Sequence, residues 1–144
     1  NPEDRCYLCK KFVFKRLRNE AGKLGINHVA DGTNSDDIKF YRPGLKALKE
    51  LGIKSPLLEN KITKADIRSF SKALKLETWD KPAYACLLTR IPYNTEIKTE
   101  ELSRIEQAEL YLMKLGFKGV RVRSHNNLAR LELDKSQINN VFKK

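Results

Sequence analysis

The sequence contains no long apolar run, and this absence excludes one class of protein. None of its apolar stretches approaches the roughly 18 residues that a membrane-spanning helix needs. The pattern of a secretory signal, a basic segment followed by an apolar one, does not stand at Asn1 either. We therefore expect a cytoplasmic protein without membrane contact.

Cysteine is also scarce. The chain has three cysteines, an odd number, and together with the missing signal segment this argues against a disulfide framework. Metal binding, cluster ligation and thiol chemistry remain as uses for these residues. Cys6 and Cys9 form a Cys-x-x-Cys pair at the start of an expected helix, where thiolates are favoured. Packing is the alternative role for both.

Acidic residues are too few to balance the basic ones. The 144 residues contain 29 Lys and Arg against 18 Asp and Glu, which gives a net charge of +11. This excess predicts an anionic partner, such as a nucleotide, a phosphorylated substrate or a nucleic acid. A solvated basic surface is the alternative, because the lysines are spread over nearly every expected helix. The length suits one domain, or one domain and a fragment of another.

The first half of the chain alternates between helices and short apolar segments. Helices are expected at residues 6–24, 43–51 and 63–74, and strands at 26–30 and 53–58. The helix ends are marked by Gly25, by Pro43 and by a capping box of Thr63 with Asp66. Helical crossovers predict parallel strands, and two parallel strands do not make a stable sheet. We therefore expect further strands before Asn1 or from a second chain.

Two stretches are predicted to be functional loops. Residues 78–93 keep no apolar period, contain two prolines and surround Cys86, which predicts a reactive loop. The alternative is an irregular linker in which Cys86 is buried. The second stretch is Asp31-Gly32-Thr33-Asn34, at the carboxyl end of an expected strand, where α/β proteins place ligands. Such residues also build ordinary turns.

The second half has a different pattern. An amphipathic helix is expected from Thr99 to Gly116, then strands at 120–123 and 128–133, and a further helix from Ser136 to Phe142. Strand alternation places Arg121 and Arg123 on one face, where they could clamp a phosphate or carboxylate. The alternative is an exposed sheet face that acids such as Glu132 balance.

A series of motifs, in order along nearly the whole chain, resembles a known family. They are Asn1-Pro2-Glu3-Asp4-Arg5-Cys6-Tyr7-Leu8-Cys9-Lys10, Asp31-Gly32-Thr33-Asn34-Ser35-Asp36-Asp37, Tyr41-Arg42-Pro43-Gly44, Ser55-Pro56-Leu57, Trp79-Asp80-Lys81-Pro82, Cys86 with Arg90-Ile91-Pro92-Tyr93, and Val120-Arg121-Val122-Arg123. This set is similar to the LarE family, PP-loop ATP pyrophosphatase-type sulfur transferases that help to make the nickel-pincer nucleotide cofactor.

The resemblance implies a fold and a domain organisation. It implies an α/β chain: the second half of a Rossmann-like parallel-sheet domain at residues 1–92, then part of a small α+β domain at 93–144. The Ser-Gly-Gly-x-Asp-Ser phosphate loop of the family is absent from this sequence. We therefore expect it to precede Asn1 or to lie on a partner chain, and we expect a homo-oligomer.

The resemblance also implies a reaction and its residues. ATP and Mg²⁺ would adenylate a carboxylate of a pyridinium dicarboxylate mononucleotide, and sulfur would then attack the acyl adenylate. Cys86 matches the sulfur-bearing cysteine, with Glu109 and Glu132 near the catalytic cleft. In the subgroup that resembles this chain more closely, Cys6, Cys9 and Cys86 would hold a 4Fe-4S cluster with one open iron. Arg121 and Arg123 would bind the substrate's phosphate, and the loop from Asp31 to Asn34 would lie on the nucleotide side.

Two alternative functions remain open from the sequence. A PP-loop enzyme of tRNA thiolation also uses a Cys-x-x-Cys pair with a third cysteine, and the charge of +11 would suit it. A basic nucleic-acid-binding module without enzymatic activity is the other, although the basic strand at 120–123 carries no aromatic residue.

Overall fold

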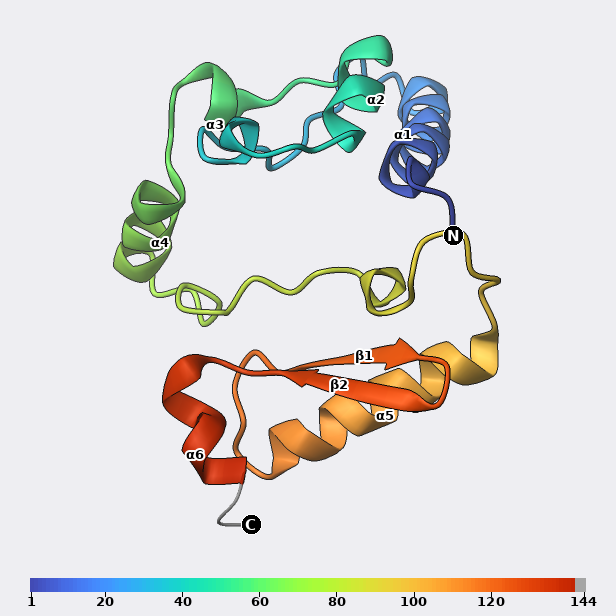
Figure 1. Cartoon of the computed structure of the whole chain (residues 1–144). Coiled ribbons are helices and arrows are strands. Elements are labelled where there is room, and N and C mark those ends of the chain that lie inside the picture. Colours follow the sequence, from blue (N-terminus) through green and yellow to red (C-terminus); the bar gives the residue numbers. More distant parts are fainter. Residues whose placement is uncertain (142–144) are drawn as a thin grey trace. The chain divides into compact units, whose positions relative to one another are not determined.

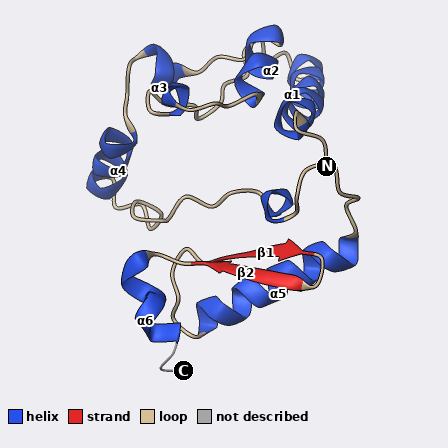
Figure 2. Ribbon diagram, viewed as in Figure 1, coloured by secondary structure: helices blue, strands red, loops and turns tan. Residues whose placement is uncertain are grey.

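The computed structural model describes residues 1–141 and shows a mixed α/β chain with one small sheet (Figures 1 and 2). The chain divides into two compact units. We call residues 4–80 the N-terminal unit and residues 1–3 with 81–144 the C-terminal unit. Along the chain, the division falls between Asp80 and Lys81, whereas the sequence predicts a boundary between residues 92 and 93. Among the described residues, no helix has both the length and the apolar character to cross a bilayer.

The N-terminal unit is mostly helical, and its three expected helices are confirmed. Its elements are α1 (Arg5–Lys23), the 3-10 turn η1 (Asp37–Lys39), α2 (Gly44–Glu50), α3 (Pro56–Glu59) and α4 (Lys64–Ala73). The capping box of α4 is present, since Asp66 N–H donates to Thr63 Oγ1 at 3.2 Å and Thr63 N–H donates to Asp66 Oδ2 at 2.9 Å. Gly25, with φ +71°, follows α1 in the left-handed conformation that ends many helices.

Helix α1 packs against α2 at close range. A Cβ atom at Gly44 would lie 2.8 Å from Lys10 Cδ, so glycine allows this approach without a shift of the Lys10 side chain. Tyr7 Oη and Lys11 Nζ both donate to Glu50 Oε2 across the contact, at 2.8 and 2.9 Å. The apolar face that the sequence predicted for α1 stays largely exposed, with Leu17 at 47% and Leu24 at 75%.

The two expected strands of this unit are not formed as a ladder. Residues 26–30 and 53–58 meet only in one parallel bridge, Ala30 with Lys54. The prediction for residues 53–58 was wrong, because Pro56 opens helix α3 and occupies a first helical position, where its missing N–H costs nothing. The parallel direction agrees with the prediction, but one bridge does not establish a Rossmann-like sheet.

The C-terminal unit contains the expected helix followed by two strands. Its elements are the 3-10 turn η2 (Leu87–Arg90), α5 (Thr99–Lys114), β1 (Arg121–His125), β2 (Leu128–Glu132), the 3-10 turn η3 (Lys135–Gln137) and α6 (Ile138–Val141). The strands pair antiparallel, with Arg121 opposite Glu132 and Arg123 opposite Arg130. The expected last helix thus begins as a 3-10 turn, and its predicted end at Phe142 lies outside the described residues.

The apolar core of this unit lies where α5 and η2 contact β1. Its buried apolar residues are Ile91, Ile105, Phe117, Val120 and Val122. Val122 and Ser124 point inward from β1, so Arg121 and Arg123 share the opposite, half-buried face, as strand alternation predicted. This face of β1 carries Arg121 and Arg123, two of the predicted site residues.

Candidate functional site

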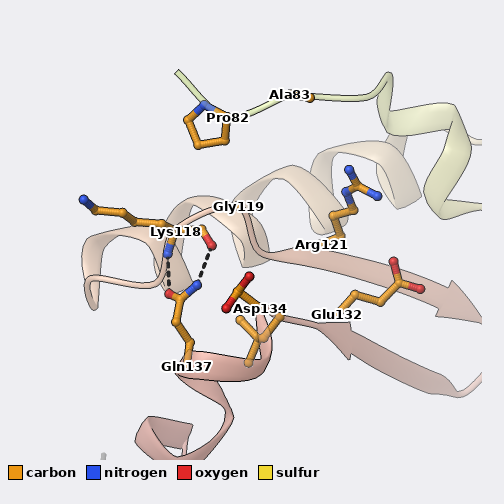
Figure 3. Close-up of a pocket in the computed structure, with 9 residues that line it drawn as sticks. Pro82, Ala83, Lys118, Gly119, Arg121, Glu132, Asp134 and Gln137 are labelled. Carbon is orange, nitrogen blue, oxygen red and sulfur yellow. Dashed lines mark hydrogen bonds between the residues drawn. The ribbon is translucent and has the colours of Figure 1, made fainter. Parts of the chain in front are cut away.

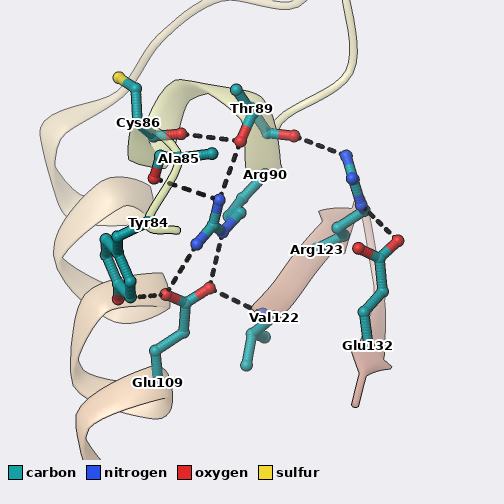
Figure 4. A network of polar contacts seen from close by, with 9 residues as sticks. All are labelled: Tyr84, Ala85, Cys86, Thr89, Arg90, Glu109, Val122, Arg123 and Glu132. Atoms are coloured by element: carbon teal, nitrogen blue, oxygen red, sulfur yellow. Dashed lines mark hydrogen bonds and ion pairs between the residues drawn. The ribbon is translucent and has the colours of Figure 1, made fainter. Parts of the chain in front are cut away.

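A fully buried ion pair holds the reactive loop against the rest of the C-terminal unit. The side chains of Arg90 and Glu109 are each 0% exposed, and Arg90 Nε lies 2.7 Å from Glu109 Oε1. Arg90 Nη2 donates to Glu109 Oε2 at 3.1 Å, which makes the contact bidentate. Tyr84 Oη and the Val122 N–H also donate to this carboxylate, at 2.6 and 2.8 Å (Figure 4).

These donors keep Glu109 ionised. Burial raises the pKa of Glu109, but the hydrogen bonds from Arg90, Tyr84 and Val122 outweigh it and leave the pKa below its ordinary value. The hydrogen bond to Glu109 likewise raises the pKa of Arg90. A carboxylate with four donors and no solvent exposure has the surroundings of a structural group. The catalytic role predicted for Glu109 by resemblance stays a prediction.

The rest of the network fixes the backbone on both sides of Cys86. Arg90 Nη1 donates to the Ala85 carbonyl at 3.3 Å and to Thr89 Oγ1 at 2.9 Å. Thr89 in turn donates to the Cys86 carbonyl from its hydroxyl at 2.7 Å and from its N–H at 2.9 Å. Cys86 itself is exposed, with its sulfur pointing away from the network (Figure 4). A buried structural cysteine, the alternative reading of this loop, does not describe this residue.

Arg123 and Glu132 join the same network from the sheet. Arg123 Nε donates to Glu132 Oε1 at 2.6 Å, and Arg123 Nη1 donates to the Thr89 carbonyl at 2.7 Å. Glu132 Oε1 also accepts from Arg130 at 2.9 Å, so one carboxylate offsets the like charges of the cross-strand pair Arg123 and Arg130. The hydrogen bond from Arg123 lowers the pKa of Glu132. Four predicted site residues, Cys86, Glu109, Arg123 and Glu132, are therefore connected through Thr89 and Arg90.

Arg121 lines a pocket of this unit, and Glu132 of the network lines it too. The pocket has a volume of about 510 Å³, and its wall includes Pro82, Ala83, Asp134 and Gln137 (Figure 3). Gln137 closes one side, because its side chain accepts from the Lys118 N–H at 2.7 Å and donates to the Lys118 carbonyl at 2.9 Å. The pocket thus places a guanidinium group beside the stretch that leads into Cys86.

The loop from Asp31 to Asn34 is a closely bonded turn in the N-terminal unit. Asp31 accepts from the hydroxyl groups of Thr33 and Ser55, and Lys10 Nζ lies 3.5 Å from its Oδ2. Burial raises the pKa of Asp31, but these hydrogen bonds leave it below its ordinary value. Thr33 and Asn34 are buried. The turn therefore has a clear structural role, and its predicted nucleotide-side role stays a prediction.

Cys6 and Cys9 lie in the first two turns of α1, and both are exposed. Their spacing of three places both thiols on one side of the helix, which suits two ligands of one metal group. Within either unit, the described residues contain no group of three side chains assembled as a metal site. The donor set is chemically suitable for an iron-sulfur cluster, and the cluster stays a prediction.

Sequence reasoning assigned no individual role to Arg90, Tyr84 or Gln137. A signal for the ion pair existed, because Glu109 follows Ile105 by four positions and so lies on the apolar face of α5. A single acidic residue on an apolar helix face requires a buried basic partner. Arg90 was a candidate for this partner, because it stands beside Ile91 in an apolar stretch. No comparable signal marks Gln137.

Comparison with known proteins identifies relatives over nearly the whole chain. The chain is 40% identical over 138 residues to a pyridinium-3,5-bisthiocarboxylic acid mononucleotide synthase of Lactiplantibacillus plantarum, covering 96% of this chain and 50% of the synthase. The resemblance to the LarE family is supported. Uncharacterized proteins of Synechocystis and Methanocaldococcus jannaschii are 51% and 43% identical, over 96% and 93% of this chain and 52% of each relative. No protein-family model matches the chain.

The chain spans about half the length of the curated relatives it matches. The similarity to the synthase covers 96% of this chain, a region that carries Cys86, the buried ion pair and the pocket.

Proposed function

We propose that this chain takes part in sulfur transfer to a carboxylate of a pyridinium dicarboxylate mononucleotide, in the manner of the synthase. The observation that carries the proposal is the 40% identity to that enzyme over 138 residues. The state of Cys86 supports it. An exposed thiol on a backbone held by hydrogen bonds at Ala85, Cys86 and Thr89 is accessible and positioned, as a sulfur-bearing residue must be.

The proposed chemistry requires activation of the carboxylate first. The carboxylate attacks the α-phosphate of ATP and pyrophosphate leaves; sulfur then attacks the acyl carbon and AMP leaves. Mg²⁺ would neutralise the triphosphate. The net charge of +11 suits a substrate and a co-substrate that are both anionic. A Rossmann-like sheet and the nucleotide-side role of the loop from Asp31 to Asn34 belong to this proposal.

A 4Fe-4S cluster on Cys6, Cys9 and Cys86 is the proposed sulfur carrier. When bound, it would supply an open iron to which external sulfide can attach. This chain's contribution is three exposed thiols, two of them at a helix N-terminus, where thiolates are favoured.

The test is a product assay on the complete gene product. The protein is incubated anaerobically with the dicarboxylate mononucleotide, ATP, Mg²⁺ and sulfide, and the nucleotide is analysed by mass spectrometry. We expect exchange of oxygen for sulfur in a carboxyl group, with release of AMP and pyrophosphate. Omission of ATP is the control. Unchanged nucleotide, with folded protein and intact ATP, would refute the proposed reaction.

Thiolation of tRNA is the second candidate, and the surface of α1 favours it. Phe12 is 62% exposed with the guanidinium group of Arg16 lying 5.6 Å from the centre of its ring, an arrangement on which a base can stack. An unmodified tRNA is therefore included in the assay. Incorporation of sulfur into tRNA, with binding that falls steeply as salt rises, would favour this candidate over the mononucleotide.

A further inference from the structure

Cys6 and Cys9 are neighbours on one side of α1. We propose that they form a reversible disulfide with each other, and that this bond withholds two of the three proposed cluster ligands when the surroundings become oxidising. The disulfide follows from the local geometry of α1. Its effect on the cluster rests on the proposed function.

The backbone of α1 places the two cysteines within disulfide range. They are the second and fifth residues of the helix, which begins at Arg5. In an ideal α-helix, residues three positions apart have Cα atoms about 5 Å apart, inside the range of about 4.4–6.8 Å found for disulfides. Their Cβ atoms are about 5–6 Å apart, whereas a disulfide needs about 3.5–4.5 Å. The bond therefore requires the first turn to tighten by about 1 to 2 Å.

The first turn of α1 is already partly tightened. The Asp4 carbonyl accepts from the Tyr7 N–H at 2.8 Å and from the Leu8 N–H at 3.1 Å. The shorter bond joins residues three positions apart, as in a 3-10 turn, where side chains at this spacing eclipse each other. The turn that holds Cys6 and leads into Cys9 therefore approaches disulfide geometry by extending a hydrogen-bond pattern that it already has.

The neighbouring helix leaves room for this movement and keeps α1 attached. A Cβ atom at Gly44, the first residue of α2, would lie 3.4 Å from the Cys6 carbonyl, and glycine has no such atom. Beyond the first turn, Lys11 donates to Glu50 at 2.9 Å and holds α1 against α2. Both cysteines are exposed, so a small disulfide molecule can reach them.

The bond forms by exchange with a low-molecular-weight disulfide, such as oxidised glutathione. The sulfur of one cysteine attacks a sulfur of this molecule, one glutathione thiol leaves with the proton, and a mixed disulfide results. The second cysteine then attacks the sulfur of the first and releases the other glutathione thiol in the same way. The protein loses two electrons and two protons, and one glutathione disulfide becomes two thiols. Neither sulfur then remains as a thiolate ligand for iron.

The disulfide is tested by peptide mass spectrometry, because both cysteines lie in one tryptic peptide, residues 6–10, between Arg5 and Lys10. The complete gene product, free of iron, is equilibrated anaerobically with oxidised glutathione and a low concentration of the reduced form, and is then blocked with iodoacetamide. A neighbouring thiol has an effective concentration of about 1 mM or more, so at about 0.1 mM reduced glutathione the closed disulfide should exceed the mixed disulfide about tenfold. The closed peptide is lighter than the dithiol by two hydrogen atoms.

Three controls define the result. Dithiothreitol should restore two alkylated thiols. Cys86→Ser should close the same disulfide to the same extent, because Cys86 takes no part in it. Cys9→Ser should leave Cys6 as the mixed disulfide with glutathione. Mixed disulfides on both Cys6 and Cys9 of the wild type, or a disulfide that includes Cys86, would overturn the inference.

The effect on the cluster is tested with protein that has been reconstituted with iron and sulfide, desalted and exposed to the same glutathione mixture. We expect the disulfide fraction to stay near zero while about four irons per chain remain bound, because the cluster occupies both thiolates. Disulfide formation with the iron fully retained would overturn the link to the cluster. A protein that forms the disulfide but never takes up iron would refute the proposed cluster, and the disulfide itself would stand.

Discussion

Among single residues, Glu109 connects several segments of the C-terminal unit. Its side chain joins α5 to η2 through Arg90, to β1 through the Val122 N–H and to the reactive loop through Tyr84. An ion pair with both side chains 0% exposed is costly to break, since the remaining charge stays buried without a partner.

Replacing Glu109 by leucine should therefore destabilise the protein strongly. We expect a loss of about 3 to 5 kcal/mol in the free energy of unfolding, measured with urea, because Arg90 is left uncompensated. The control is Glu106→Gln, an exposed acid on the same helix, for which little change is expected. Adding Arg90→Met to Glu109→Leu should restore part of the loss. A Glu109→Leu protein as stable as the control would show that the pair contributes nothing.

The same pair gives a pH dependence of defined sign. The pKa of Glu109 is lower in the folded protein than its ordinary value of 4.5, so its stabilisation is complete above that value and is lost as pH falls through the folded pKa. Other carboxylates with lowered pKa contribute similarly, so the double variant Arg90→Met/Glu109→Leu is the reference. We expect the wild type to lose more stability than this variant in urea titrations below pH 4.5. Parallel curves would contradict the prediction.

At the scale of elements, α4 depends on its first turn. Asp66 and Thr63 satisfy each other's backbone N–H groups in the capping box. Thr63→Ala should cost about 1 kcal/mol of stability, the usual loss for an N-cap residue. Thr78→Ala, an exposed threonine of the same unit, is the matched control. Equal midpoints of thermal unfolding for the two variants would show that the cap contributes little.

Local signals of this kind explain how much of the fold was predictable. The capping box, the glycines after α1 and α5, and the alternation of Arg121 with Arg123 each depend on neighbouring residues, and the structure agrees with them. The prediction of a strand at 53–58 was wrong because the preference of Pro56 for the start of a helix prevailed over the β-propensity of the segment. A parallel ladder also depends on distant strands, which short-range patterns do not specify.

The candidate site was predictable in its residues but only partly in their roles. Cys86 was singled out from its surroundings, and it is exposed. The separate surroundings of Glu109, Arg121 and Arg123 were not foreseen, because they depend on Arg90 and Glu132 being brought close by the tertiary fold. Residue type alone does not show whether the guanidinium group of an arginine is hydrogen-bonded within the protein, as that of Arg123 is.

At the scale of the whole molecule, the cluster prediction concerns all three cysteines. Anaerobic reconstitution of the complete gene product with iron and sulfide should give about four irons per chain, as a cubane requires. Replacing any one of Cys6, Cys9 or Cys86 by serine should abolish cluster formation. Loss of sulfur transfer in Cys86→Ser only, with active, iron-free Cys6→Ser and Cys9→Ser variants, would contradict the cluster and would favour Cys86 giving up its own sulfur.

In the proposed function the protein transfers sulfur, and Cys86, held exposed by its network, is required for the transfer. Its most direct test is the yield of thiocarboxylated mononucleotide from the wild type and from Cys86→Ser, measured by mass spectrometry under identical ATP and sulfide. Serine preserves the size and the backbone bonds of the residue, so only the sulfur chemistry changes. We predict product from the wild type and none from Cys86→Ser, with equal stability of the two proteins. Equal yields from both would contradict the claim.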